Sequence, residues 1–270
     1  VPLRVRRYQK IEHGVKAKKY LGQHFLHQRS TAEKIVRLLS ELPESALVVE
    51  VGPGHGALTE HLVHSVHKPI LLIETDQDLI EELKQKYPQC QVIHADFLKL
   101  DLATLTGGRT MQVIGNFPYN ISSQIVFRIL DYVQYIPEVV GMFQKEMADR
   151  IASKPGSKSY GILSVLTQAW YQVESCITLS PGHFVPPPKV QSSVIRLRRL
   201  PTVDPLAQEP LFRSIVKSSF NQRRKMLRNS LKVYFPEAVL LEEAIFTRRP
   251  EQLTLQDFYH LTTLSLKHQS

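Results

Sequence analysis

Four consecutive residues, Asn116-Phe117-Pro118-Tyr119, could hold an exocyclic amine for attack and stack a flat ring beside it. The amine of adenine is a poor nucleophile because its lone pair is delocalised, so a catalyst must accept hydrogen bonds from both N–H groups. The side-chain carbonyl of Asn116 and the backbone carbonyl of Phe117 or Pro118 would be preorganised acceptors, and Tyr119 offers a face for an unstacked base. The tetrapeptide favours methyl transfer to adenine N6, although ordinary strand-to-helix turns also use Asn and Pro.

Further polar groups follow the predicted strands. Residues 50–56 read EVGPGHG, in which three glycines let the backbone approach a ligand closely. Glu74 follows Gly52 by 22 residues, the spacing at which a carboxylate meets ribose hydroxyls in nucleotide-binding βαβ units. Asp96 and Phe97 end the next strand and could read and cover an adenine. Because the carboxyl ends of parallel strands share one edge of a sheet, these groups are expected to line one site.

A glycine loop followed by an acid also fits a nicotinamide dinucleotide. Dinucleotide fingerprints use GxGxxG, whereas Gly52, Gly54 and Gly56 are spaced GxGxG and lack the third position. Hydride transfer would also need a group that polarises the substrate, and no obvious candidate is present. The pattern therefore favours a methyl donor over a dehydrogenase.

The net charge of +9 on 270 residues is concentrated in two segments. Residues 1–20 carry +6 and residues 189–232 carry +9, while residues 21–188 carry −4 and residues 233–270 carry −2. Basic flanks suit a catalytic domain that grips a polyanion, because Lys and Arg displace counterions from phosphates. A solvated charged surface without a partner stays an alternative, above all for the first twenty residues.

Short β-branched runs alternate with amphipathic stretches over the first two-thirds of the chain, which predicts an α/β domain with a mainly parallel sheet. Strands are expected at 46–51, 70–75, 91–94, 111–115, 139–143, 172–178 and 194–199. Helices are expected at 57–66, 78–86, 122–132, 145–153 and 161–170, and a Ser30–Glu33 capping box predicts an earlier helix to about residue 42. After a linker from Pro201, helices at 211–231, 236–246 and 255–266 predict a small helical domain.

Composition also bears on location and metals. The chain has no apolar run of membrane-spanning length, and residues 1–4 lack the apolar stretch of a signal peptide. Cys90 and Cys176 stand apart without a CxxC pattern, and no histidine shows metal-ligand spacing. We therefore expect a cytoplasmic protein in a reducing compartment, with no membrane contact and no metal site.

Four motifs occur together: GQHFL at 22–26, EVGPGHGALT at 50–59, GNFPYNIS at 115–122 and FVPPPKV at 184–190. From about residue 18 to the C-terminus, the chain resembles the KsgA (RsmA) family of small-subunit rRNA adenine dimethyltransferases. The resemblance implies an α/β, Rossmann-like class I methyltransferase sheet with a small C-terminal all-helical domain. The expected division is a basic extension at 1–17, an S-adenosylmethionine-dependent methyltransferase domain at 18–200 and a helical rRNA-binding domain at 201–270.

The resemblance also implies roles for single residues. The segment matching 23–26 closes over the donor, Glu74 takes the ribose hydroxyls, and Asp96 takes the adenine amine. Cofactor contacts are implied at Gln23, His24, Leu26, Glu50, Gly52, Gly54, Glu74, Asp96 and Asn116. Catalytic roles are implied at Asn116, Pro118, Tyr119 and Phe184, with the target adenine held between Tyr119 and Phe184. His24 and Phe117 depart from the family's usual Asn and Leu, and Phe184 could instead plug the core.

The implied function is transfer of methyl groups from S-adenosylmethionine to N6 of two adjacent adenosines near the 3′ end of 16S rRNA. Transfer would be direct and in line, without a covalent intermediate or a side-chain base, because the sulfonium is already activated. The expected partner is small-subunit rRNA in an immature subunit, and the protein is expected to be a monomer. Alternatives are an Erm-type large-subunit rRNA enzyme, a non-enzymatic nucleic-acid-binding or assembly factor, and a protein or small-molecule methyltransferase.

Basic residues of the C-terminal third predict an RNA-binding surface. No acid occurs in residues 211–232, and on a single helix Arg224 and Arg228 would share a face. Such a ridge would grip rRNA backbone, because duplex RNA offers its phosphates more readily than its base edges. The residues expected to bind RNA are Lys189, Arg223, Arg224, Lys225 and Arg228.

Overall fold

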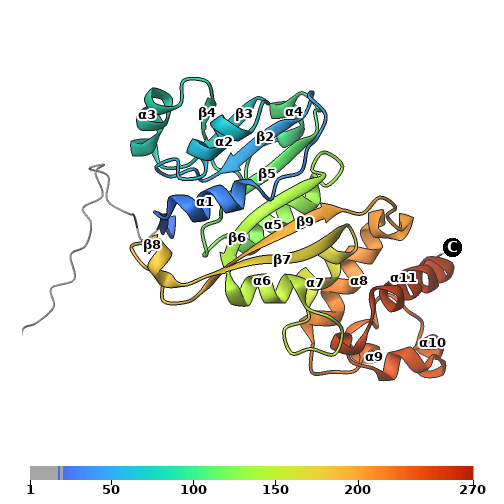
Figure 1. The fold of residues 1–270 in the computed structure, drawn as a ribbon. Coiled ribbons are helices and arrows are strands. Elements are labelled where there is room, and N and C mark those ends of the chain that lie inside the picture. The colour runs from blue at the N-terminus through green and yellow to red at the C-terminus, as the bar shows by residue number, and fades with distance from the viewer. Residues whose placement is uncertain (1–17, 19–20, 270) are drawn as a thin grey trace, which may run out of the picture.

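The computed structural model describes Lys18 and residues 21–269, and the extension predicted at residues 1–17 lies outside the described residues. Its centre is a seven-stranded sheet with helices on both faces (Figure 1). Five strands run parallel in the order β4-β3-β2-β5-β6, and β9 then pairs antiparallel with both β6 and β7. The strands are β2 (Leu47–Val51), β3 (Ile70–Glu74), β4 (Gln91–His94), β5 (Met111–Asn116), β6 (Glu138–Gln144), β7 (Tyr171–Leu179) and β9 (Ser192–Arg199). All seven predicted strands are confirmed, each end within two residues.

The sheet separates two hydrophobic cores because neighbouring residues of a strand point to opposite faces. In β2, Val48 packs on one side, while Leu47 and Val49 pack on the other. The first core is covered by α1 (Arg29–Val36), α2 (Thr59–Ser65) and α3 (Gln77–Lys86). The second is covered by α4 (Leu102–Thr106), α5 (Ser122–Asp131), α6 (Lys145–Ala152) and α7 (Ile162–Gln168). Burial on both faces explains why β2 and β3 consist of apolar residues apart from one glutamate in each strand.

After β9 the described chain forms only helices, which gather at one end of the molecule beside α7 (Figure 1). They are η3 (Pro205–Gln208), α8 (Pro210–Asn221), α9 (Leu227–Ser230), α10 (Glu237–Glu242), η4 (Ala244–Thr247), η5 (Pro250–Gln252) and α11 (Leu255–Gln269). A third core joins them to α7, in which Val165 and Leu166 pack with Phe212, Phe246 and Phe258. The helices therefore share buried surface with the sheet-containing part.

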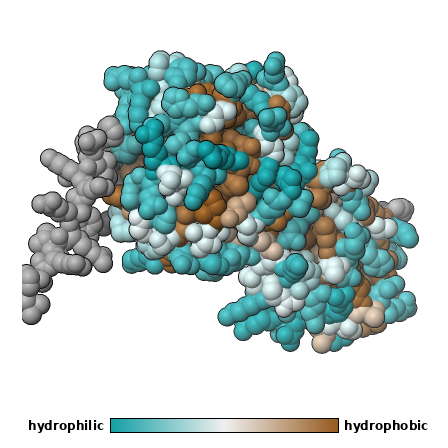
Figure 2. Space-filling view, viewed as in Figure 1, coloured by the Kyte–Doolittle hydropathy of each residue, from teal (hydrophilic) through white to brown (hydrophobic). Residues whose placement is uncertain are grey.

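The outer surface of the molecule is mainly hydrophilic, as the amphipathic pattern of the helices predicts. Figure 2 shows mostly hydrophilic side chains on the outside, with apolar side chains gathered near the middle of the larger part and beside the C-terminal helices. This distribution is typical of amphipathic helices that bury one stripe. No helix in the described part of the chain is long and apolar enough to span a membrane.

Three predicted helices are wrong in their bounds. The Ser30–Glu33 capping box is absent, because α1 begins at Arg29 with Gln28 as its N-cap and no side-chain cap hydrogen bond. The helix also stops at Val36, since the amide and hydroxyl of Ser40 both donate to the buried Glu138 carboxylate at 2.8 Å. The helix expected at 236–246 is likewise divided into α10 and η4.

The helix expected at 211–231 breaks at its centre. α8 ends at Asn221, and the backbone of Gln222 leaves the helical region with φ −121° and ψ 48°. The Arg223 guanidinium donates to the carbonyls of Ser157 and Lys158, which draws this turn against the loop before α7. A single helical ridge of residues 223–228 therefore does not exist, and the prediction of a shared face for Arg224 and Arg228 is wrong.

Six short elements among the described residues were not predicted, three of which are the 3-10 helices η2 (Pro181–His183), η3 and η5. The other three are α4, whose N-cap Asp101 accepts from two backbone amides, and the two-residue strands β1 (Phe25–Leu26) and β8 (Phe184–Val185). Within the described part of the chain, β1 and β8 pair only with each other, in antiparallel register. A two-residue strand has no periodicity of its own, so its pairing partner is what makes it a strand.

Candidate active site

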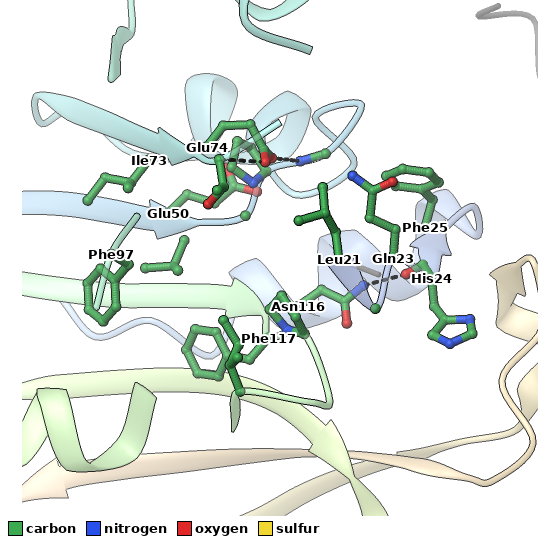
Figure 3. A pocket seen from close by; sticks show the side chains of 18 of the residues that line it. Leu21, Gln23, His24, Phe25, Glu50, Ile73, Glu74, Phe97, Asn116 and Phe117 are labelled. Carbon is green, nitrogen blue, oxygen red and sulfur yellow. Dashed lines mark hydrogen bonds between the residues drawn. The ribbon is translucent and has the colours of Figure 1, made fainter. Parts of the chain in front are cut away.

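A cavity of about 250 Å³ lies at the carboxyl edge of β2, β3, β4 and β5 (Figure 3). Its position follows from parallel strand order, because all four strands end at the same edge. The predicted residues that line it are Gln23, His24, Leu26, Glu50, Gly52, Gly54, Glu74, Asp96, Asn116, Pro118 and Tyr119. The structure therefore brings the N-terminal motif, the glycine loop and the Asn116 loop to one place.

The glycine loop after β2 requires glycine for two different reasons. Gly52, Gly54 and Gly56 all have positive φ, at +69°, +59° and +82°. A Cβ on Gly54 would meet the Phe25 ring at 2.9 Å, whereas a Cβ on Gly52 would meet nothing within 4 Å. Gly52 thus borders open cavity, where its backbone can approach a ligand closely.

Glu74 joins the glycine loop to the turn after β3. Its Oε1 accepts from the amides of Thr75 and Asp76 at 2.8 and 2.9 Å, and its Oε2 accepts from the Gly54 amide at 3.1 Å. A carboxylate has about four acceptor positions, so Oε2 keeps a lone pair for a ligand. Burial raises the pKa of Glu74, and the three amide hydrogen bonds oppose that rise.

Glu50 is the most deeply buried acid of the cavity, at 1% exposed. Thr59 Oγ1 donates to its Oε2 at 2.6 Å. Burial raises the pKa of Glu50 to about 8; the Thr59 hydrogen bond lowers it, and the neighbouring Glu74 charge adds to the rise. In the protein without ligand, this carboxyl group therefore holds a proton at neutral pH.

Asp96 and Phe97 follow β4, and only Asp96 places a polar group at the cavity. Asp96 is partly exposed, and its Oδ1 accepts from the Leu98 amide at 3.0 Å, which fixes the carboxylate at the cavity. Phe97 is only 3% exposed and packs in the core under the same wall. The Asp96 carboxylate beside the apolar Phe97 suits adenine, whose flat ring carries a polar amine at one edge.

The N-terminal motif closes the cavity from outside the sheet. Pairing of β1 with β8 holds the segment in place, and the Phe25 ring packs on His55 of the glycine loop at 4.5 Å. Gln23 Nε2 donates to Asp76 Oδ2 at 2.8 Å, and Lys18 Nζ bonds Asp76 Oδ1 at 2.5 Å. Asp76 also caps α3, and its side chain is buried and ion-paired with Lys18.

Asn116 at the end of β5 has its amide orientation set by the N-terminal motif. Its Nδ2 donates to the backbone carbonyl of His24 at 2.7 Å (Figure 3). A carbonyl only accepts, so the NH₂ must face it, and Oδ1 is left to accept a hydrogen bond from a ligand. This is the orientation that an amine substrate needs.

Two aromatic residues follow Asn116 and serve different surroundings. Phe117 is fully buried, with its ring edge-on to Phe143 at 5.1 Å, and Gly115 and Gly141 make room for it. The departure from Leu is therefore absorbed inside the core. Tyr119 borders the cavity, and its hydroxyl lies 2.5 Å from Ser192 Oγ. Burial raises the pKa of Tyr119, so the phenol stays neutral.

Phe184 is the predicted residue that the structure does not bring to the cavity. It lies in β8 opposite Leu26, is 2% exposed and packs in the core under α1. In this arrangement its ring plugs the core, which is the alternative that sequence reasoning left open, and it presents no face to a base. The ring that does contact Tyr119 belongs to His24, stacked at 5.4 Å with an interplanar angle of 26°.

The sequence profile of the ribosomal RNA adenine dimethylase family matches residues 14–258 of this chain. The chain belongs to that family. The ribosomal RNA small subunit methyltransferase A of Bacteroides fragilis is 48% identical over 251 residues, covering 92% of both proteins. The protein of the same name from Parabacteroides distasonis is 48% identical over 260 residues, covering 94% of this chain and 96% of that relative.

Solved structures agree on the fold of this dimethylase. A dimethyladenosine transferase from Plasmodium falciparum superimposes with a TM-score of 0.77 at 23% identity, covering 90% of this chain and 98% of that one. The 23S rRNA methyltransferase ErmE superimposes with a TM-score of 0.64 at 26% identity, covering 88% and 99%. The expected Rossmann-like class I methyltransferase fold with C-terminal helices is confirmed.

The predicted RNA-binding residues of the dimethylase lie outside the residues that line the cavity. Lys189, Arg224, Lys225 and Arg228 are exposed. Arg223 is half-buried because its guanidinium bonds the loop before α7. That interaction brings the 223–225 turn beside the exposed Lys154 and Lys158, two cations that sequence reasoning missed because they lie some 65 residues away along the chain.

Proposed function

We propose that this dimethylase transfers methyl groups from S-adenosyl-L-methionine to N6 of two adjacent adenosines near the 3′ end of small-subunit rRNA. The single observation that carries the proposal is the orientation of the Asn116 amide at the cavity, where the His24 carbonyl takes the NH₂ group and leaves Oδ1 as the acceptor for a ligand. Membership of the rRNA adenine dimethylase family supports the reaction, and relatives at 48% identity that are named for the small subunit support the substrate.

The cavity suits the donor, since its polar groups match the parts of a nucleoside. We assign the ribose to the Glu74 carboxylate, the adenine amine to Asp96, and the methionine part to the open backbone at Gly52. Gln23, Leu26 and the backbone of His24 close the site, and Gly54 completes the loop. S-adenosylmethionine, when bound, supplies a methyl group already activated by its sulfonium charge.

The acceptor groups then need only position the amine and stabilise charge. Asn116 Oδ1 accepts one N–H of adenine. The carbonyl of Pro118 already accepts from the Ile121 amide at 3.2 Å, which favours the Phe117 carbonyl as the second acceptor. Such fixed acceptors strengthen as positive charge develops on the nitrogen, and Tyr119 stacks the ring. The methylated ammonium can lose its proton to water, so no side-chain base is required.

Three alternatives have less support. The large-subunit enzyme ErmE shares 26% identity with this chain, against 48% for the small-subunit relatives. A non-enzymatic binding factor would not need the oriented Asn116 together with Glu74 and Asp96. A protein or small-molecule methyltransferase would not need the basic surface described next.

We assign rRNA binding to a basic surface made by Arg224 and Lys225 of the 222–226 turn, by Lys154 and Lys158, and by Arg228. Arg223 holds the two segments together and contributes to this surface indirectly. Lys189, in the exposed loop after β8, would anchor a phosphate near the cavity. We further propose that the substrate is rRNA in an immature subunit, and that the enzyme acts as a cytoplasmic monomer.

The test is an incubation with labelled S-adenosylmethionine and unmethylated ribosomal subunits of each size, followed by mapping of the labelled base. We expect label on two adjacent adenosines of the small-subunit rRNA and none on the large subunit. Label on a large-subunit adenine would favour the Erm-type alternative. No label on either RNA, with the donor bound normally, would favour a binding factor.

A further inference from the structure

We propose that the imidazole of His24 forms the second wall of the slot that holds the target adenine, opposite Tyr119. The inference rests on the proposed function and assigns a specificity-determining role to a side chain that the resemblance placed on the donor. Its first support is the direct stacking of the two rings, with centroids 5.4 Å apart and planes inclined by 26°. Two flat rings lying face to face at the cavity edge are the walls that a flipped base requires.

The backbone carbonyl and the side chain of His24 point in different directions and contact different segments. Its carbonyl accepts from Asn116 Nδ2 at 2.7 Å and so belongs to the catalytic loop. Its ring extends the other way, and Nδ1 lies 2.8 Å from the Pro186 carbonyl (Figure 3). Because that carbonyl can only accept, Nδ1 carries the proton and the ring is held flat beside Tyr119. The side chain is thus positioned by residues 182–186, which form a lid segment around β8, independently of the donor.

The His24 and Tyr119 rings stack directly on each other, so the slot between them is closed. A base between two rings is separated from each by about 3.5 Å, so the outer rings must stand roughly 7 Å apart. The centroid distance of 5.4 Å is shorter than this, so the His24 ring must move outward by at least about 1.6 Å when the base enters. Among the bonds described for the ring, only the Nδ1 hydrogen bond to Pro186 must change for this movement. Without substrate, the imidazole covers the stacking face of Tyr119.

Phe184, the aromatic residue expected opposite Tyr119, is buried in the core instead. Phe184 is 2% exposed and pairs with Leu26 through β8 and β1, so bringing its ring to the base would disrupt the core under α1. His24 needs no such rearrangement because it already lines the cavity. His24, which stands where the family usually has Asn, thereby supplies an aromatic ring at the cavity, while the ring of Phe184 is buried in the core.

The experiment compares His24→Ala, His24→Phe and the control His27→Ala. His27 is matched because its Nε2 lies 2.9 Å from the Gly182 carbonyl on the same lid, and it is outside the cavity lining. Donor Kd is measured by calorimetry, and kcat/KM is measured with unmethylated small subunits. A hairpin RNA carrying 2-aminopurine at the target position reports stacking through quenching of its fluorescence.

For His24→Ala we expect kcat/KM for the subunits to fall on the order of tenfold, the effect of removing one base-stacking partner. Donor Kd should stay within about twofold, since the His24 carbonyl still holds Asn116. The 2-aminopurine quenching should weaken in His24→Ala and be restored in His24→Phe, which keeps a flat ring. His27→Ala should resemble the wild type.

Three results would overturn the inference. Unchanged quenching and kcat/KM in His24→Ala would place the base elsewhere, equal losses in His27→Ala would reflect a loosened lid, and a weakened donor Kd with normal acceptor kinetics would return the ring to the donor. Failure of the proposed function looks different, because wild-type protein would then not methylate small subunits at all.

Discussion

Protonation of Glu50 should make donor binding depend on pH, and Glu50→Gln should remove that dependence. The carboxyl is 1% exposed, and its pKa rises from the ordinary 4.5 to about 8, mainly through burial. At 1.36 kcal/mol per pH unit, this difference corresponds to about 5 kcal/mol favouring the protonated form. At pH 7 Glu50 is therefore mainly protonated before the donor binds.

A sulfonium bound in the same cavity favours the carboxylate, because an opposite charge stabilises the ionised form. Donor binding at pH 7 should then release up to about one proton from Glu50, and donor affinity should rise with pH until about pH 8. The demethylated product has a neutral sulfur, so its binding should release fewer protons. This difference would help the enzyme to discriminate donor from product.

The assay is titration calorimetry at pH 7 in buffers of different ionisation enthalpy, with the slope giving protons released. Glu50→Gln serves as the reference, since the amino group of the donor also titrates near pH 8, and Thr59 can still donate to the amide oxygen. Wild type should release more protons than Glu50→Gln. Equal slopes would refute the linkage between Glu50 and the donor charge.

The same group predicts the pH dependence of stability. A carboxyl whose pKa is raised on folding stabilises the folded state fully below its unfolded pKa near 4.5, and that contribution is lost as pH rises to about 8. Thermal unfolding of the empty protein should therefore show Glu50→Gln gaining stability relative to wild type between pH 5 and 8. A constant difference across that range would contradict a buried, protonated Glu50.

Further predictions concern catalysis, stability and RNA binding. Asn116→Ala should lower kcat by about 10²-fold or more with little change in donor Kd; wild-type turnover in single-turnover assays would contradict a catalytic role. Glu138→Ala removes a buried carboxylate that pairs with the partly buried Arg196 at 2.7 Å and also accepts hydrogen bonds from Ser40 and Gln112, and it should cost about 3–5 kcal/mol in urea unfolding. Glu174→Ala, from a more exposed ion pair with Arg198, should cost below about 1 kcal/mol. Replacing Arg224 and Lys225 with Gln should flatten the salt dependence of rRNA binding by roughly one unit for each phosphate that is no longer bound; weaker binding at an unchanged slope would mean that the interactions are not ionic.

Much of the sheet is encoded locally. Runs such as LVVEV in β2 and ILLIE in β3 are long enough to be strands and too apolar to lie on a surface, so their burial on both faces follows from composition. The convergence of Glu50, Glu74, Asp96 and Asn116 also follows, since parallel neighbours end at one edge. The helix break at 222–226 does not follow, because Arg223 leaves the helix for carbonyl groups near residue 157 that no local pattern reveals.

By itself, then, the sequence determined the order of strands and helices, the glycine loop and the identity of the polar groups at the carboxyl edge. These features depend on periodicity and on residue type, which are properties of neighbouring positions. Tertiary structure alone decided which atom of Asn116 is left to accept a hydrogen bond, which aromatic ring covers Tyr119 and which acid keeps its proton. Each of these depends on an interaction between distant segments, such as the hydrogen bond that joins Asn116 to His24 across 92 residues, or on burial that only the packed fold creates.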